Sequence, residues 1–239
     1  MIIIPARIQS SRFPKKVLVD VNGLPMFVAT AKRVESIDEV VVATDSNEVL
    51  EVAKQYGIKA VLTKTSHGSG TDRVNEAVSK LGLKEDEIII NVQADEPFIE
   101  PHIIQTLLTK AKEVFKNDEY AMASCYNKVD AEHANSPNLV KVVVDESNNA
   151  LYFSRSKIPY NRDESDVEYF GHLGIYAYSV KSLSEFCAFA PSTLENIEKL
   201  EQLRALDNGK KIAMICVESN SIGIDTKEDL QEALKRNLK

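Results

Sequence analysis

Short apolar runs alternate with amphipathic segments over the first half of the chain. The apolar runs lie at residues 2–5, 39–45, 59–63 and 87–93. Apolar residues recur at helical spacing in the segments between and after them, which predicts helices at residues 26–36, 46–57, 71–82 and 100–115. Strands with little alternation that are separated by helices indicate a parallel sheet covered on both faces. The pattern therefore predicts an α/β fold with a Rossmann-like, mostly parallel sheet flanked by helices.

The pattern changes after residue 118, where longer β-rich segments begin. Strands are expected at residues 120–129, 139–156 and 168–179. Asn148 and Asn149 stand between two β-rich runs and indicate a hairpin turn. No linker rich in Pro, Gly or Ser separates the two halves, so we expect a single domain over residues 1–239 that carries a β-rich insert at about residues 120–179.

The last part of the chain returns to helical patterns. Helices are expected near residues 181–189, 194–207 and 226–238, and a strand at residues 211–219. Thr226 is the expected cap of the last helix.

Composition and charge exclude several classes of protein. The chain has 36 acidic and 29 basic residues, and its net charge of −7 argues against nucleic-acid binding. Cys125, Cys187 and Cys216 are odd in number and far apart, so neither a zinc site nor a disulfide framework is expected. The sequence has no signal-peptide pattern at its start and no apolar run long enough to span a membrane. We therefore expect a cytoplasmic protein in a reducing compartment.

A basic loop follows the first predicted strand. The stretch IPARIQSSRFPKK contains four basic and no acidic residues: Arg7, Arg12, Lys15 and Lys16. Open α/β sheets bind ligands at the carboxyl ends of their strands, and such a loop suits a polyphosphate. It contains neither a GxxxxGK[ST] nor a GxGxxG pattern. A solvated basic surface explains the same charges, and both interpretations stay open on composition alone.

Two aspartates also follow predicted strands or precede a helix. Asp95 lies in NVQADEP just after a buried strand, and Asp225 lies in GIDT before the last helix. Either residue alone could be a turn former or a cap. Together they could bind Mg²⁺, which takes one or two carboxylates plus phosphate oxygens.

Several motifs, taken together, resemble a known family. The opening loop is similar to the pattern I-P-A-R-x-x-S-x-R-x-P-x-K of the CMP-sugar-acid synthetases. The segments ALYFSRSKIPYNR, HLGIYAY, LEQLRAL and GIDTKEDL resemble the 3-deoxy-manno-octulosonate (Kdo) cytidylyltransferases. The motifs occur in the family's order from residue 2 to residue 230. The resemblance implies a fold of the nucleotide-diphospho-sugar transferase type and a homodimer formed through the β-rich insert. It also implies an Mg²⁺-dependent enzyme that forms CMP-Kdo and diphosphate from CTP and Kdo for lipopolysaccharide biosynthesis.

The same resemblance assigns the nucleotide and metal residues. The expected nucleotide-binding residues are Pro5, Ala6, Arg7, Ser10, Arg12, Lys16, Ser69, Gly70 and Arg73. Among them, the segment HGSGTDR would contact the cytosine. The expected catalytic residues are Arg7, Lys16, Asp95 and Asp225, and the two aspartates are the expected ligands of Mg²⁺.

The resemblance also assigns residues to the sugar. The expected sugar-binding residues are Gln93, Arg162, His172, Tyr176, Glu201 and Gln202. His172 and Tyr176 are four positions apart and share a face of a strand. Glu201 and Gln202 would point at the sugar hydroxyls from a helix. A histidine on a strand is also common in protein cores, and a glutamate on a helix is commonly solvated.

The sequence departs from the family at two places and leaves alternatives open. Ala94 stands where the family usually has glycine and Lys15 where it often does, and Arg155 has either a structural or a substrate-binding role. The sugar motifs favour Kdo over sialic acid, while an 8-amino analogue of Kdo stays possible as the substrate. An alternative of another class is a catalytically inactive nucleotide-binding protein. The presence of Arg7, Asp95 and Asp225 argues against it.

Overall fold

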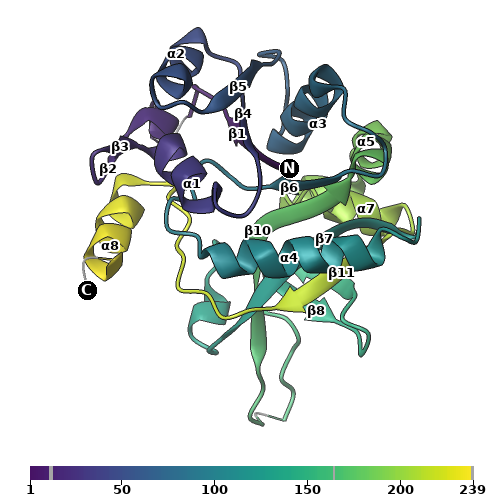
Figure 1. The fold of residues 1–239 in the computed structure, drawn as a ribbon. Coiled ribbons are helices and arrows are strands. Elements are labelled where there is room, and N and C mark those ends of the chain that lie inside the picture. The colour runs from purple at the N-terminus through teal and green to yellow at the C-terminus, as the bar shows by residue number, and fades with distance from the viewer. Residues whose placement is uncertain (11–12, 164, 238–239) are drawn as a thin grey trace. The chain divides into compact units, whose positions relative to one another are not determined.

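The computed structural model describes residues 1–10, 13–163 and 165–237, and the chain forms two compact units. The first unit comprises Met1–Thr106 and Ser219–Lys239, and the second comprises Leu107–Glu218. The boundary between them falls inside helix α4 (Pro101–Val114). Figure 1 labels the helices and strands of both units. Whether the two units form a single domain depends on how they are arranged, so the expected single domain stays a prediction.

The first unit is built on a parallel sheet. Its strands, in spatial order, are β6 (Ile88–Asn91), β1 (Ile2–Ala6), β4 (Val40–Thr44) and β5 (Lys59–Leu62). Every residue of β1 is buried, as expected for a strand that reads as a continuous apolar run. The connecting helices are α1 (Met26–Val34), α2 (Asn47–Gln55) and α3 (Gly70–Leu81). Figure 1 shows α1 and α2 on one side of these strands and α3 on the other.

Several helix ends in this unit lie where capping residues occur in the sequence. The Ser46 hydroxyl accepts a hydrogen bond from the Val49 backbone N–H at the start of α2. Gly82, the residue after α3, has a φ of 67°, which glycine adopts without the steric cost of a Cβ. Thr226 caps the last helix, α8 (Lys227–Asn237), by accepting from the Asp229 N–H at 3.1 Å. These caps fix the points at which loops meet the helices.

A short hairpin in the first unit was not anticipated. Strands β2 (Asp20–Val21) and β3 (Leu24–Pro25) are joined by Asn22 and Gly23, whose φ angles are 54° and 87°. An Asn-Gly pair with both φ angles positive is the usual signal of a two-residue hairpin turn. The Asn-Gly pair was present in the sequence, but each strand has only two residues and shows no alternation of apolar and polar positions.

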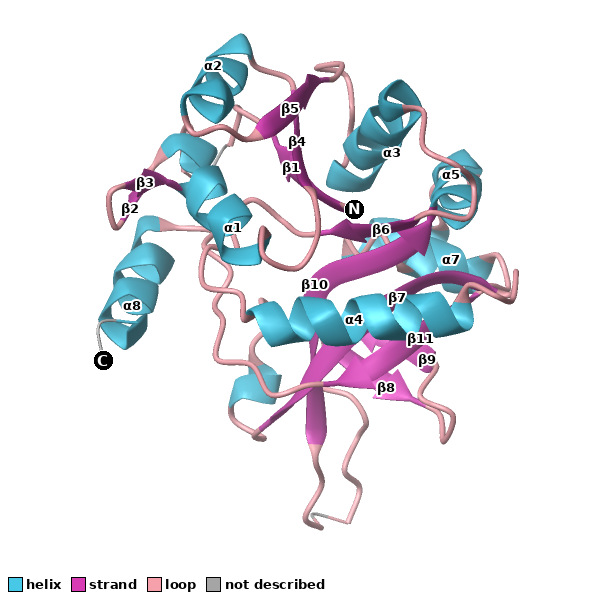
Figure 2. Ribbon diagram, in the orientation of Figure 1, coloured by secondary structure: helices cyan, strands magenta, loops and turns pink. Residues whose placement is uncertain are grey.

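The second unit is β-rich, and Figure 2 shows its strands in magenta. Its strands are β7 (Tyr120–Val129), β8 (Lys141–Val144), β9 (Ala150–Ser154), β10 (Tyr169–Ser179) and β11 (Lys211–Cys216). Strand β10 runs antiparallel to β7 and β8, while β11 runs parallel to β7. The turn between β8 and β9 contains Asn148 in a left-handed conformation with a φ of 58°. The β-rich segment expected from the sequence is therefore confirmed.

One helix of the second unit differs from the sequence prediction. In addition to α5 (Val180–Ala188), the structure has α6 (Thr193–Glu198) and α7 (Leu203–Asp207), where one helix was expected over residues 194–207. Lys199 has a φ of 55°, which ends α6, and the Arg204 guanidinium from α7 binds the Glu195 carboxylate of α6 at 2.6 Å. The prediction that Glu201 and Gln202 lie on a helix is therefore wrong.

The fold class is α/β, as predicted, with helices flanking a parallel sheet in the first unit and a mixed β-rich second unit. Within the described part of the chain, every helix is too short or too polar to cross a membrane.

Candidate active site

A cavity of about 290 Å³ opens in the first unit beyond the carboxyl ends of β1 and β6. The residues that line it come from the loops after these strands, the start of α3 and the segment before α8. They are Pro5, Arg7, Gln9, Ser10, Lys16, Val17, His67, Gly68, Ser69, Gly70, Arg73, Gln93, Ala94, Asp95 and Asp225. The cavity thus brings together most residues that the sequence assigned to the nucleotide, and both aspartates assigned to the metal.

The basic loop begins at the cavity, directly after β1. Arg7 is exposed there, and the backbone N–H of Ile8 donates to the Asp45 carboxylate at 3.0 Å. Ala6 lies behind the loop as a buried strand residue whose carbonyl accepts from the Thr44 hydroxyl at 2.7 Å. Arg12, which was also assigned to the nucleotide, lies outside the described residues. The loop therefore leaves the sheet at a fixed point and presents Arg7 to the cavity.

Lys16 joins the two candidate metal ligands. Its Nζ lies 2.5 Å from Asp95 Oδ2 and 3.0 Å from Asp225 Oδ1. Burial alone would lower the pKa of Lys16, but the two ion pairs outweigh this effect and leave its pKa raised. Lys16 is therefore held as a cation between two carboxylates that are 79 and 209 residues away from it in sequence.

The same carboxylates fit a divalent cation. Their oxygens approach one point from two separate segments, and hard oxygen ligands of this kind suit Mg²⁺ when phosphate oxygens complete the coordination. Across the described ranges, no group of three or more His, Cys, Asp and Glu side chains is arranged to hold a metal without such help. Asp95 and Asp225 thus fit a metal that arrives with a phosphate ligand.

Glu96, next to Asp95, has a carboxyl group whose pKa is raised. The loss of solvent around its carboxyl raises the pKa of Glu96 to about 7, and the negative charge of Asp95 contributes to this rise. The Ser221 hydroxyl donates to Glu96 Oε2 at 2.9 Å.

The segment HGSGTDR forms part of the cavity wall. Ser69 caps α3 by accepting from the Asp72 N–H at 3.1 Å. A Cβ on Gly70 would lie 3.3 Å from Pro5 Cγ and 3.4 Å from Gln93 Oε1. Gly70 therefore allows a close approach between α3 and the two loops that line the cavity.

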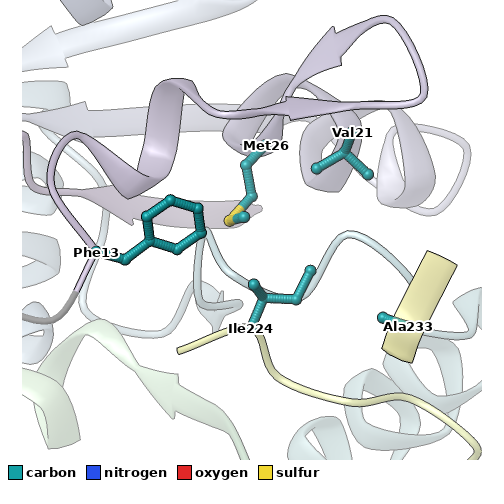
Figure 3. Packing of buried hydrophobic residues seen from close by; sticks show 5 residues of the cluster. All are labelled: Phe13, Val21, Met26, Ile224 and Ala233. Atoms are coloured by element: carbon teal, nitrogen blue, oxygen red, sulfur yellow. The ribbon is translucent and has the colours of Figure 1, made fainter. Parts of the chain in front are cut away.

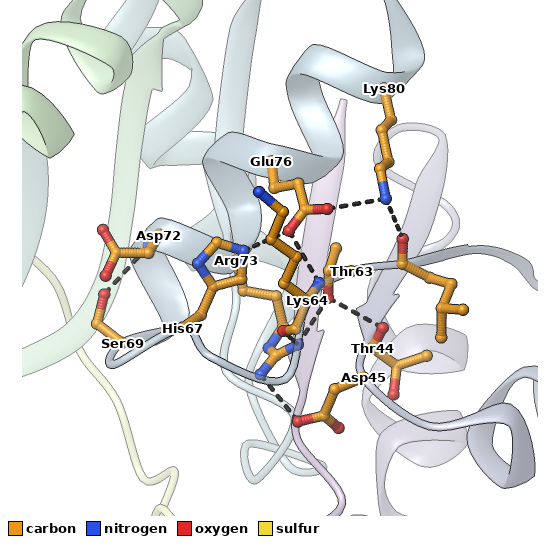
Figure 4. Close-up of polar contacts among 11 residues, drawn as sticks. Thr44, Asp45, Thr63, Lys64, His67, Ser69, Asp72, Arg73, Glu76 and Lys80 are labelled. Atoms are coloured by element: carbon orange, nitrogen blue, oxygen red, sulfur yellow. Dashed lines mark hydrogen bonds and ion pairs between the residues drawn. The ribbon is translucent and has the colours of Figure 1, made fainter.

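Arg73 is 1% exposed and is held by protein partners, which Figure 4 shows. Its guanidinium donates to Thr63 Oγ1 at 2.6 Å and to Asp45 Oδ2 at 3.0 Å. Because Asp45 also accepts from Ile8, Arg73 connects α3 to the basic loop. Its contact with cytosine stays a prediction, while its part in holding the loop is visible in the structure.

His67 lines the cavity but was not singled out from the sequence. Its Nε2 contacts the carboxylate of Glu76 on α3, which also accepts from Lys80 Nζ at 2.8 Å (Figure 4). Burial would raise the pKa of Glu76, but the hydrogen bonds that it accepts lower it to about 2. The signal that could have found His67 is its place in HGSGTDR, before three residues that were assigned to the nucleotide.

The residues assigned to the sugar fall into both units. Gln93 belongs to the cavity of the first unit, where its Nε2 donates to Asn91 Oδ1 at 3.1 Å. The second unit contains the other assigned residues: Arg162, His172, Tyr176, Glu201 and Gln202. Arg162 is exposed in the connection between β9 and β10. The sugar-binding roles stay predictions.

His172 and Tyr176 lie close together on β10. Their ring centroids are 5.5 Å apart, so they share a side of the strand as expected, although the strand register shifts between Leu173 and Tyr176. Burial lowers the pKa of His172 to about 3, and its Nε2 lies 2.9 Å from the Ser124 hydroxyl. Burial, and then the charge of Glu201, raises the pKa of Tyr176. Both side chains are therefore neutral near pH 7, and each can donate and accept hydrogen bonds.

Gln202 is 4% exposed and precedes α7. Within the described part of the chain, its Nε2 has no hydrogen-bond partner. A buried unpaired amide is costly. This observation gives Gln202 the capacity to donate to a ligand from the turn, rather than from the expected helix.

The structure describes the contacts of Arg155, Lys15 and Ala94, whose roles the sequence left open. Arg155 donates from Nε to the Glu198 carbonyl at 2.8 Å and from Nη1 to the Pro137 carbonyl at 3.0 Å, which is a structural role. Lys15 has a φ of 52°, and its Nζ lies 2.7 Å from the exposed Glu48 carboxylate. Its left-handed backbone is a conformation that glycine adopts without the steric cost of a Cβ. Ala94 is buried, and its carbonyl accepts from the Thr30 hydroxyl at 2.9 Å.

Similarity to known proteins extends over nearly the whole chain. The sequence profile of the cytidylyltransferase family matches residues 1–212. A curated 3-deoxy-manno-octulosonate cytidylyltransferase from a Nitratiruptor species is 57% identical over 233 residues, and the match covers 97% of each chain. An enzyme of the same name from Wolinella succinogenes is 54% identical over 239 residues, covering 98% of each chain.

Similarity in structure agrees with similarity in sequence. A solved structure described as CMP:2-keto-3-deoxy-manno-octonic acid synthetase complexed with CTP has a TM-score of 0.92 and 38% identity to this chain. The match covers 99% of this chain and 97% of that one. The chain therefore belongs to the cytidylyltransferase family and, within it, to the 3-deoxy-manno-octulosonate cytidylyltransferases.

Proposed function

We propose that this chain transfers CMP from CTP to Kdo and releases diphosphate. The observation that carries the proposal is the cavity of the first unit, in which a basic loop and two carboxylates meet at Lys16. Membership of the Kdo cytidylyltransferases supports CTP and Kdo as the substrates. A net charge of −7 fits small-molecule substrates better than a nucleic acid.

The phosphates of CTP would bind at the basic loop. The Arg7 guanidinium offers paired donors to phosphate oxygens, and Lys16 offers a compact ammonium. Ser10 lines the same cavity and can donate a hydrogen bond. Fixed donors of this kind stabilise the negative charge that builds up around phosphorus in the transition state.

Asp95 and Asp225 would hold Mg²⁺ together with the phosphates. When bound, Mg²⁺ supplies positive charge to the phosphate oxygens and to the departing diphosphate. The carboxylates also keep Lys16 charged and oriented, as the raised pKa of Lys16 indicates. These residues thus contribute position and charge.

The sugar would be bound by the residues that the resemblance assigns to it, Gln93 of the cavity among them. The Arg162 guanidinium suits the Kdo carboxylate, and the neutral His172 and Tyr176 suit its hydroxyls. The anomeric oxygen of Kdo then forms a bond to the α-phosphorus of CTP as the bond between the α-phosphorus and the bridging oxygen breaks. The hydroxyl proton leaves to solvent, and diphosphate carries away the electron pair of the broken bond. Most of the rate then comes from orientation and charge stabilisation.

The proposal extends to location and assembly. Free cysteines, of which Cys125 is buried, suit the reducing cytoplasm. A homodimer is proposed from the apolar residues exposed on the second unit, such as Leu151 and Ile197.

One assay tests the proposed activity. Purified protein is incubated with Mg²⁺, one nucleoside triphosphate and one sugar acid from a panel of Kdo, 8-amino-Kdo and sialic acid, and diphosphate release is measured. We expect release with CTP and Kdo, and slower release with ATP or GTP by more than about tenfold. Faster release with 8-amino-Kdo than with Kdo would reassign the sugar, and release with sialic acid but not Kdo would refute the proposal. Equal rates with all nucleoside triphosphates would refute the assignment of cytosine as the recognised nucleobase.

A further inference from the structure

The segment that brings Asp225 to Asp95 is held by glutamates outside the nucleotide-binding set. Residues 219–226 form an irregular segment before α8, so its backbone groups need partners other than a sheet or a helix. Glu100 supplies two of them. Its Oε1 accepts from the Asn220 N–H at 2.8 Å, and its Oε2 accepts from the Ser219 hydroxyl at 3.0 Å. One carboxylate thereby fixes the beginning of the segment.

Glu96 holds the middle of the same segment. Its Oε2 accepts from the Ser221 hydroxyl at 2.9 Å. A Cβ on Gly223 would lie 2.9 Å from Glu96 Oε1, a separation that real Cβ atoms essentially never show. The backbone at Gly223 therefore lies directly against the Glu96 carboxyl, and a side chain at this position would displace one of them.

The end of the segment is anchored to the core and to α8. The Ile224 N–H donates to the Asp95 carbonyl at 2.9 Å, and the Ile224 side chain is buried against Phe13 and Met26 (Figure 3). The Asp225 N–H donates to the Asp229 carboxylate at 3.0 Å. Both ends of the segment are thus fixed, and its path between them follows Glu96 and Glu100.

We propose that Glu96 and Glu100 are positioning residues that hold residues 219–224 and thereby set the distance between the Asp225 and Asp95 carboxylates. The inference rests on the proposed function, in which these aspartates hold Mg²⁺. The glutamates act through Asp225, because their hydrogen bonds go to the segment that carries it. Partners behind a metal ligand typically change metal affinity by about 10- to 100-fold when they are replaced.

The test measures metal affinity without turnover. Mn²⁺ is titrated into protein and CTP in the absence of Kdo, and bound Mn²⁺ is followed by water-proton relaxation, with CTP alone as the blank. We expect Glu96→Ala and Glu100→Ala to weaken Mn²⁺ binding by about tenfold or more. Glu96→Gln keeps an oxygen that can accept from Ser221 and should bind Mn²⁺ more tightly than Glu96→Ala. Glu51→Ala, at an exposed position of α2, is the matched control and should bind like the parent protein.

A second readout and a milder variant separate positioning from general stability. The Mg²⁺ concentration for half-maximal diphosphate release should rise in Glu96→Ala, while kcat at saturating Mg²⁺ stays near that of the parent protein. If the alanine variants do not fold, Ser221→Ala removes one hydrogen bond and should still weaken Mn²⁺ binding. Variants that melt at a lower temperature but bind Mn²⁺ like the parent protein would overturn the inference. A parent protein that binds no Mn²⁺ with CTP would instead overturn the metal site of the proposed function.

Discussion

At the scale of single residues, three charged side chains meet in the first unit. Lys16 lies within 3.0 Å of carboxylate oxygens from both Asp95 and Asp225. A lysine held between two carboxylates stays protonated, and the aspartates face the same point from different segments of the chain. This arrangement explains why residues so distant in sequence are expected to act as one unit.

We expect Asp95→Asn and Asp225→Asn each to stay folded and to lose about 100-fold in rate, or about 2.7 kcal/mol of transition-state stabilisation. Asparagine keeps the size and turn-forming ability of aspartate but removes the charge that pairs with Lys16 and that would bind the proposed metal. The rate of diphosphate release with CTP and Kdo is the measurement, and circular dichroism is the control for folding.

The double variant tests whether the aspartates share a ligand. Its loss should be much smaller than the product of the two single losses, since residues that act together are not additive. Multiplicative losses would show two independent roles, and full activity in both folded single variants would place the metal elsewhere.

His172 gives a second test at this scale, through its pKa of about 3. The folded state disfavours the protonated ring, so its contribution to stability is complete above the ordinary histidine pKa and is lost as the pH falls toward 3. We expect the free energy of unfolding of the parent protein to fall by roughly 2–3 kcal/mol more than that of His172→Gln between pH 7.5 and pH 4.5. Denaturant unfolding at both pH values measures this, and parallel pH profiles of the two proteins would show that His172 is not held neutral by burial.

At the scale of elements, capping residues decide where the loops of the site begin. The α3 cap at Ser69 and the α8 cap at Thr226 place the residues next to them, Gly70 and Asp225, beside the cavity. In the second unit, a left-handed backbone position ends a helix. Lys199 ends α6 at a φ of 55° and so puts Gln202 in a turn.

Lys199→Gly should raise the free energy of unfolding by about 1 kcal/mol, because glycine adopts a left-handed backbone without the steric cost of a side chain. Lys54→Gly is the matched control, since Lys54 lies within α2 and glycine there should cost about 1 kcal/mol. Thermal or denaturant unfolding of both variants measures the effect. A loss of stability in Lys199→Gly would show that the lysine side chain matters more than the backbone conformation.

Periodicity and caps predicted most elements of the fold, but not those that depend on contacts between segments. The strands of the first unit are continuous apolar runs, and the strand over residues 120–129 was predicted with its observed bounds. The break at Lys199 was missed because residues 194–207 keep a helical pattern, while the pairing of Arg204 with Glu195 forms only in the folded chain.

The cavity was predictable only in part, because some of its residues occur in sequence motifs and others do not. Arg7, Lys16 and the two aspartates occur in motifs, and they line one cavity. His67 stands in the motif HGSGTDR, whereas Glu96 and Glu100, behind Asp225, have no local signal that separates them from solvated residues. Their roles appear only when Glu76 and residues 219–223 are placed next to them.

At the scale of the whole molecule, the chain contains a first unit with the cavity proposed for the nucleotide and a second unit with most residues assigned to the sugar. The second unit also exposes large apolar side chains. Leu151 on β9 is 59% exposed, and Ile197 on α6 is 72% exposed. Such residues are common at interfaces, which fits the proposed homodimer.

We expect sedimentation equilibrium to give about twice the chain mass of 26.6 kDa. Leu151→Glu and Ile197→Glu should shift the protein toward monomer, because an ionised carboxylate is costly in an apolar interface. Leu62→Glu, at a position in the first unit that is 43% exposed, is the control and should leave the association unchanged. A parent protein that is monomeric at micromolar concentration would refute the dimer.

The most direct test of the central claim follows one oxygen atom through the reaction. Kdo is equilibrated with ¹⁸O-labelled water to label its anomeric hydroxyl, and is then mixed with CTP, Mg²⁺ and the protein in unlabelled water. Mass spectrometry of the products locates the label. The account predicts CMP-Kdo with ¹⁸O in the bond between sugar and phosphate, and unlabelled diphosphate, since the sugar oxygen attacks the α-phosphorus. Labelled diphosphate, unlabelled CMP-Kdo from labelled Kdo, or the absence of CMP-Kdo would contradict it.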